Sequence, residues 1–97
     1  MSERFPPDQT LERAPDAVWR EVDGRAAVIS LDGGRIRTLN PVGTFVWSLL
    51  DGRPVGALLQ ALAERYPEVS AADLARDLDA FLDDLSRRGL VLPGPPP

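Results

Sequence analysis

Three residue types with special chemistry are missing from this chain of 97 residues: cysteine, histidine and lysine. Without cysteine the chain forms no disulfide and offers no thiolate to a metal or a substrate. Without histidine it lacks the most frequent general base and the commonest metal ligand. Ser30, Ser48 and Ser70 fall in expected strand, helix and helix-cap positions, with no base to activate them. These absences predict a protein that is not an enzyme and has no cofactor.

The acidic residues invite a metal-binding interpretation, which their spacing disfavours. Hard cations such as Ca²⁺ are held by several oxygens that converge from a loop. The acids in question are spread around an expected helix: Asp73, Asp77, Asp79, Asp83 and Asp84. A solvated helix face explains them, and we predict no metal site.

The charge balance and the lack of long apolar runs exclude two classes of partner. All 11 basic residues are arginine, and 15 acidic residues leave a net charge of −4. Affinity for nucleic acids comes mainly from neutralising phosphates, which an acidic chain does poorly. No apolar run approaches the roughly 20 residues of a membrane span, and the first residues lack the apolar core of a signal peptide. We therefore expect a cytoplasmic protein that binds neither nucleic acid nor membrane.

The length fits one domain, with polar, proline-containing segments at its ends. Residues 1–14 are expected to form a flexible N-terminal arm, and residues 93–97 a disordered proline-rich tail, since proline neither continues a helix nor joins a central strand. The ordered domain is thus predicted to span residues 15–92.

Three short strands are predicted in the first half of the domain, at residues 17–22, 25–31 and 35–39. Asp23-Gly24 is a strong hairpin signal, and Asp32-Gly33-Gly34 supplies a second tight turn. Two consecutive hairpins make an antiparallel meander. The third strand is therefore an edge of the sheet unless another segment covers it.

Three amphipathic helices are predicted to follow. Asn40-Pro41 is a good start for the first, Pro54 opens the second, and Ser70 caps the third, which Gly89 ends. Apolar residues recur at helical spacing in all three, as Val42, Phe45, Val46 and Leu49 do in the first. The predicted fold class is α+β, with a three-stranded antiparallel sheet followed by three helices.

A distinctive run of residues begins at the start of the first helix, with the sequence LNPVGTFVWSLLDGRPVGALL at residues 39–59, and continues through residues 62–67, 77–85 and 88–91. Together with the order of elements, these residues resemble the PqqD-like family of RiPP recognition elements. This resemblance implies a winged helix-turn-helix-like fold that binds the leader peptide of a ribosomally synthesised precursor. The partners implied are that leader and a modifying enzyme, such as a radical SAM enzyme, a cyclase or a leader peptidase.

In this family the leader adds as a strand beside the third strand and packs against the third helix. Carried over to this chain, the resemblance implies binding residues on both elements: Arg35, Ile36, Arg37, Thr38 and Leu39 on the strand, and Leu74, Asp77, Leu78, Phe81, Asp84 and Leu85 on the helix. An exposed strand edge suits such β-augmentation. Many members carry aromatic residues where this chain has Ile36-Arg37-Thr38, which leaves the pathway and the leader motif open.

Two alternatives remain at this stage. The topology also permits a winged-helix DNA-binding regulator, although its recognition helix would carry five aspartates against three arginines. The free strand edge also allows a homodimer, since the same edge pairs two copies as readily as it pairs a peptide.

Overall fold

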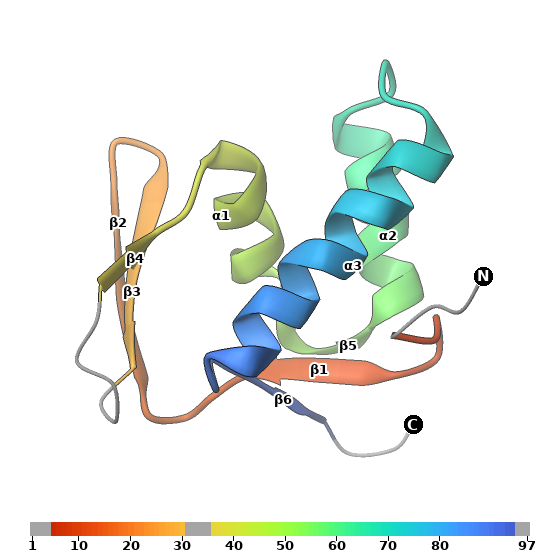
Figure 1. The fold of residues 1–97 in the computed structure, drawn as a ribbon. Helices are drawn as coiled ribbons and strands as arrows, with labels where there is room; N and C mark the ends of the chain where they lie inside the picture. The colour runs from red at the N-terminus through yellow and green to blue at the C-terminus, as the bar shows by residue number, and fades with distance from the viewer. Residues whose placement is uncertain (1–4, 31–35, 95–97) are drawn as a thin grey trace.

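The computed structural model describes residues 5–30 and 36–94 (Figure 1). These residues form six strands and three helices, in the order β1 (Thr10–Arg13), β2 (Ala17–Val22), β3 (Arg25–Ser30), β4 (Ile36–Thr38), α1 (Pro41–Ser48), β5 (Asp51–Pro54), α2 (Val55–Arg65), α3 (Ala71–Arg87) and β6 (Val91–Pro93). The strands make two antiparallel sheets with the helices packed between and beside them. The predicted α+β class is confirmed, while the likeness to a winged helix-turn-helix stays a prediction.

The first sheet has the strand order β2-β3-β4 and is the predicted meander. Asp23 and Gly24 join β2 to β3 with φ of 54° and 78°, the pair of positive values that a type I′ hairpin requires. Val22 pairs with Arg25 directly across this turn. The second predicted turn, at residues 32–34, lies outside the described residues. In this sheet β4 is an edge, as the sequence predicts.

The second sheet has the order β5-β1-β6 and differs from the sequence expectation. Its central strand, β1, comes from the segment that was expected to be a flexible arm. Leu11 and Ala14 are 2% and 4% exposed, so this part of the chain is packed into the domain. The reason lies in pairing with distant segments: Thr10 pairs with Pro54, and Arg13 with Val91. Residues 10–14 therefore belong to the domain.

The C-terminal boundary also lies later than expected. Pro93 is the last residue of β6 and pairs with Leu11, and the Gly94 N–H donates to the Thr10 carbonyl at 2.8 Å. Proline is tolerated here because β6 is an edge strand. Residues 95–97 lie outside the described part of the chain.

The three helices begin at the residues that the sequence marks, and α3 also ends at its marked glycine, whereas Asp51 and Gly52, which follow α1, lie in strand β5. The Asn40 side chain accepts a hydrogen bond from the Gly43 N–H at 2.7 Å, and Ser70 caps α3 in the same way through Asp73. At the other end of α3, Gly89 has φ of 70°, and the Leu90 N–H reaches the Leu85 carbonyl at 2.9 Å. Together with the bond from the Gly89 N–H to the Ser86 carbonyl, this is a Schellman ending.

The core lies where the helices meet both sheets, and Trp47 of α1 is at its centre. Its side chain is fully buried, and Trp19 of β2 packs edge-to-face against it with 6.1 Å between ring centroids. Arg13 of β1 lies over the Trp19 ring and donates to the Trp47 carbonyl at 2.7 Å. This cluster ties the two sheets to α1. No helix in the described residues is long and apolar enough to cross a membrane.

Candidate functional site

The outer edge of β4 presents unpaired backbone groups. The Leu39 N–H donates to the Ala26 carbonyl at 2.8 Å, and Arg37 pairs with Val28, so these residues direct their backbone groups toward β3. In an antiparallel pair, the backbone N–H and C=O groups of successive residues point alternately toward the partner strand and away from it. The N–H and C=O groups of Ile36 and Thr38 therefore point away from the sheet, where a further strand can pair with them.

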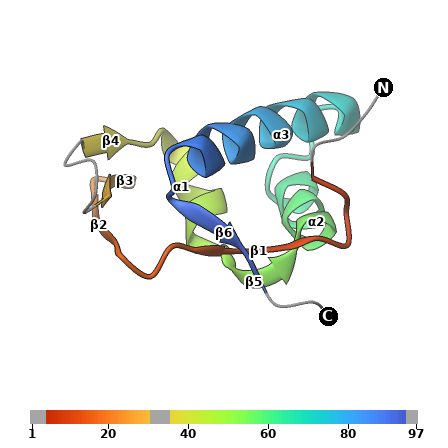
Figure 2. The same ribbon diagram turned by 60° about the horizontal axis from the view of Figure 1, so that its bottom comes forward.

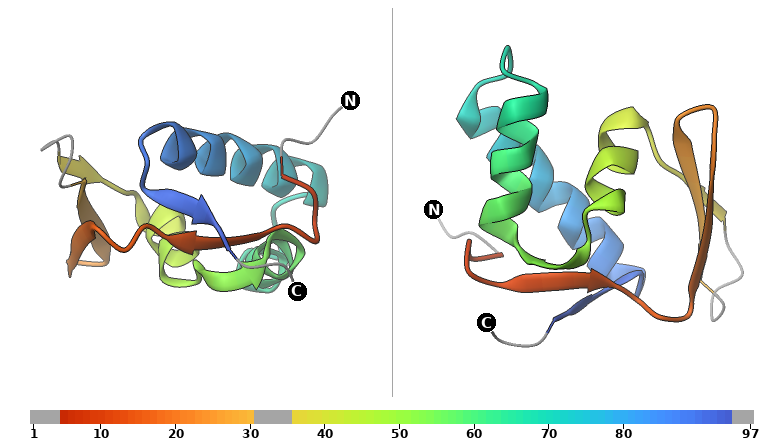
Figure 3. Two further views of the ribbon diagram at one scale, coloured as in Figure 1. Left: turned by 90° about the horizontal axis from the view of Figure 1, so that it is seen from below. Right: turned by 180° about the vertical axis from the view of Figure 1, so that it is seen from behind.

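Helix α3 runs beside this edge and is joined to it by an ion pair. In Figure 2 and in the left panel of Figure 3, β4 and α3 lie on the same side of α1, which forms the floor between them. Arg37 Nη2 lies 2.6 Å from Asp84 Oδ2, and Asp84 Oδ1 accepts a further hydrogen bond from Arg88 at 3.1 Å. One carboxylate therefore faces two guanidinium groups. This ion pair and the apolar pocket described next are together called the cleft.

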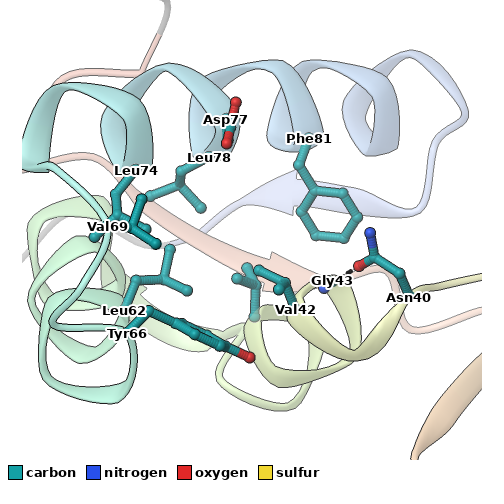
Figure 4. A pocket seen from close by; sticks show the side chains of 11 residues that line it. Asn40, Val42, Gly43, Leu62, Tyr66, Val69, Leu74, Asp77, Leu78 and Phe81 are labelled. Atoms are coloured by element: carbon teal, nitrogen blue, oxygen red, sulfur yellow. Dashed lines mark hydrogen bonds between the residues drawn. The ribbon is translucent and has the colours of Figure 1, made fainter.

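An apolar pocket opens beside the ion pair, about one helical turn back along α3. It has a volume of about 290 Å³ and is bounded by all three helices (Figure 4). Phe81 stands at its mouth opposite Asn40, and Asp77 lies at its rim. The remaining walls are almost entirely aliphatic or aromatic: Val42, Gly43, Val46, Leu62, Tyr66, Val69, Leu74 and Leu78. Such a pocket suits a bulky apolar side chain.

The close approach of α1 to α3 at this mouth depends on Gly43. A Cβ atom at this position would lie 3.1 Å from Phe81 Cε1 and 3.2 Å from the Asn40 Oδ1 atom. Glycine inside a helix costs roughly 0.5–1 kcal/mol relative to alanine. The absence of a side chain therefore sets where the Phe81 ring lies over α1.

The residues expected to bind a peptide divide into three groups in the structure. Leu74, Asp77, Leu78 and Phe81 line the pocket, and Arg37 and Asp84 form the ion pair between β4 and α3. Leu39 and Leu85 are 3% and 0% exposed and are core residues that line no described pocket. Ile36, 67% exposed, and Thr38 turn their side chains away from α3. Arg35 lies outside the described residues.

The walls that α1 and α2 contribute were not expected from the sequence. The sequence marks Asn40 as the start of a helix and gives Gly43, Leu62 and Tyr66 no role in a binding site. The one local signal was Gly43, an unfavourable residue inside a helix whose presence points to a close neighbour. The others carry no such signal, because a pocket wall and a core contact use the same side chains.

Several acidic side chains of α3 are paired with arginines. Within residues 5–30 and 36–94, no group of three or more acids lies close enough together to hold a metal ion. Asp73 pairs with Arg76, Asp83 with Arg87, and Asp84 with Arg37 and Arg88. Asp73, Asp83 and Asp84 of α3 thus pair with neighbouring arginines.

The sequence of this chain matches one protein family over most of the domain just described. The family described as Coenzyme PQQ synthesis protein D (PqqD) matches residues 25–91, which run from β3 to β6. The chain belongs to the PqqD family. No curated protein matches it. The β4 edge, the Arg37–Asp84 pair and all residues that line the pocket of this PqqD-family chain fall inside the matched range.

Two solved structures resemble the PqqD-family chain over nearly their whole length. One is TbiB1 in complex with the TbiA(beta) leader peptide, with a TM-score of 0.77 and 27% identity over 82% of this chain and 93% of that one. The other is lasso peptide synthetase B1 complexed with the leader peptide, with a TM-score of 0.73 and 26% identity over 86% and 98%. Both of these similar chains carry a bound leader peptide.

Proposed function

We propose that this chain is a non-catalytic adaptor that binds the leader of a ribosomally synthesised precursor peptide and delivers it to a modifying enzyme. The observation that carries the proposal is the free edge of β4 beside the apolar pocket under α3. The similar structures of TbiB1 and lasso peptide synthetase B1 contain leader peptides, which supports a peptide as the ligand.

The leader would add as a fourth strand on β4. Its backbone pairs with the N–H and C=O groups of Ile36 and Thr38, and alternate side chains face α3. From Asp84 back to Leu78 along α3 is about 9 Å, which an extended peptide spans in about three residues. We therefore expect the leader side chain that fills the pocket to lie about three residues from the one beside Arg37.

Apolar contacts would dominate the affinity. Burying one aliphatic or aromatic side chain contributes about 1.5–3 kcal/mol. Ion pairs with Arg37 or Asp77 lie at the exposed margin of the cleft, where each contributes about 0–1 kcal/mol. Arg37 and the acids would mainly select the direction and register of the leader. Capture raises the local concentration of the attached core peptide at the enzyme.

The decisive experiment measures the anisotropy of a fluorescent leader peptide, taken from a precursor encoded next to this chain, as the protein is added. We expect saturable binding at micromolar protein. Ile36→Pro removes an N–H from the free edge and should weaken binding about tenfold or more. Ile36→Thr keeps the N–H and the β-branched shape, and is the matched control.

Two outcomes would overturn the proposal. If the leader fails to bind while duplex DNA binds saturably, the chain is the winged-helix regulator that the topology permits. If Ile36→Pro, shown to be folded by circular dichroism, binds the leader as Ile36→Thr does, strand addition to β4 is wrong even though the leader binds.

A further inference from the structure

The face of the β2-β3-β4 sheet that is turned away from the helices carries an exposed apolar row. Val18 pairs with Ile29, and Ile29 with Ile36, so the three side chains lie side by side across the strands. Val18 and Ile36 are 55% and 67% exposed. In Figure 1 and in the right panel of Figure 3, the helices lie on the other side of this sheet. The row therefore faces outward.

Among the described residues of β2, β3 and β4, the charged side chains on this outer face are all positive. Strand alternation places Arg20 and Arg25 on the same face as Val18 and Ile29, beside the 56% exposed Val22. Among the described strand residues no acid lies on this face, although the chain carries a net charge of −4. Neither arginine has an ion-pair partner in the described part of the chain. The outer face thus combines exposed aliphatic groups with unpaired guanidinium groups.

We propose that this outer face docks the modifying enzyme, through a patch of the enzyme that combines apolar side chains with carboxylates. The inference rests on the proposed function, because it names the surface by which the adaptor meets its enzyme. Arginine beside apolar groups is typical of protein interfaces, where a carboxylate on the partner pairs with the guanidinium as both lose water.

The charge of the outer face favours an enzyme over three other possible partners: a second copy of this chain, a nucleic acid and a membrane. A two-fold contact between copies through this face would bring Arg20 and Arg25 of both copies together without an acid on the face to neutralise them. Two arginines are too few to hold a nucleic acid by its phosphates. An anionic membrane surface is held by clusters of four or more basic residues. An acidic protein surface fits both the sign and the small number of charges.

The outer face is placed so that peptide and enzyme bind at the same time. The cleft uses the backbone edge of β4 and the side of the sheet that faces α3, where Arg37 meets Asp84. The outer face lies on the opposite side of the same strands, and β2 is at the far edge of the sheet from β4. The enzyme would therefore contact the adaptor next to the bound leader without covering the cleft.

The experiment compares three variants in two separate binding assays. Val18→Asp and Arg20→Glu alter the outer face on β2, and Arg76→Glu makes the same charge change at a side chain of α3 that is 73% exposed. One assay is leader anisotropy, and the other is calorimetry with the purified modifying enzyme encoded beside the precursor. We expect Val18→Asp and Arg20→Glu to weaken enzyme binding about tenfold or more and to leave leader affinity within about twofold. Arg76→Glu should change neither affinity.

The outcomes separate this inference from the proposed function. Wild-type enzyme affinity in a folded Arg20→Glu variant would overturn the docking face while the leader still binds. Failure of the wild-type chain to bind the leader would instead remove the proposed function, and the enzyme assay would still test the face by itself. A dimer in sedimentation, or binding to phosphatidylglycerol vesicles, that Arg20→Glu abolishes would overturn the inference in favour of a second copy or a membrane.

Discussion

Arg37 and Asp84 connect the edge of the first sheet to the last helix, with 2.6 Å between Nη2 and Oδ2. The pair spans the cleft in which we place the leader. Arg37 Nε is shielded from solvent and makes no hydrogen bond. Because Asp84 also binds Arg88, two guanidinium groups share one carboxylate at this end of the cleft. A carboxylate from a bound peptide would balance the remaining positive charge.

The strength of this ion pair can be tested through Arg37→Ala. Both side chains are about one-third exposed, 38% and 33%, so solvent screens their attraction. We expect the free energy of unfolding in urea to fall by about 1 kcal/mol or less, and the difference to shrink in high salt. Arg76→Ala is the control, since its pair lies within α3 and should contribute less. A loss of several kcal/mol that salt does not reduce would show that the pair is structural.

The mouth of the pocket can be narrowed by Gly43→Ala. The new methyl group would press on the Phe81 ring at the mouth of the pocket, and the ring would have to shift by a few tenths of an ångström. Better helix propensity offsets the crowding, so stability should change by less than about 1 kcal/mol while leader affinity falls severalfold. Gly56→Ala is a matched control, because its Cβ would meet the Pro7 carbonyl at 3.2 Å, away from this pocket. Equal leader affinity in both variants would show that the placement of the Phe81 ring does not affect leader binding.

The contribution of β1 is tested by Leu11→Ala. Leu11 is 2% exposed in the central strand of the second sheet, so its truncation leaves a cavity. We expect a loss of about 2–5 kcal/mol in thermal or urea unfolding. Leu92→Ala in the neighbouring β6, where the side chain is 42% exposed, should cost less than about 1 kcal/mol. Similar small losses in both would mean that residues 10–14 are dispensable, as the sequence suggests.

We expect the stability of the fold to depend on pH through Asp51 in β5. Arg53 donates two hydrogen bonds of 2.9 Å to its carboxylate and lowers the pKa of Asp51 from 3.8 to about 2. A lowered pKa in the folded state means that ionised Asp51 stabilises the fold above its ordinary pKa, and that this contribution is lost as pH falls toward 2. Carboxyl NMR titration should show Arg53→Met returning the pKa toward 3.8. An unchanged pKa would exclude Arg53 as the cause.

The sequence predicts well the elements whose ends are marked by short turn or helix-capping motifs. Asp23-Gly24 adopts the two positive φ values of a type I′ turn, Asn40 caps α1, and Gly89 ends α3. The binding positions on α3 were implied by the family resemblance; Leu74, Leu78 and Phe81 line the pocket, and their role in binding stays a prediction. Leu85 shares their spacing but lies in the core, because spacing fixes a helix face and not which of its residues a neighbour covers.

By itself the sequence determined the hairpin, the three helices and the edge position of β4, since each depends on conformational preferences within one short segment. Only the tertiary structure decided the second sheet and the pocket. Thr10–Arg13 becomes a strand because Pro54 and Val91 are brought to it from far along the chain, and no local pattern encodes that pairing. The pocket likewise exists because Gly43 lets α1 approach Phe81 of α3. These two residues are far apart in the sequence, so no local conformational preference predicts their contact.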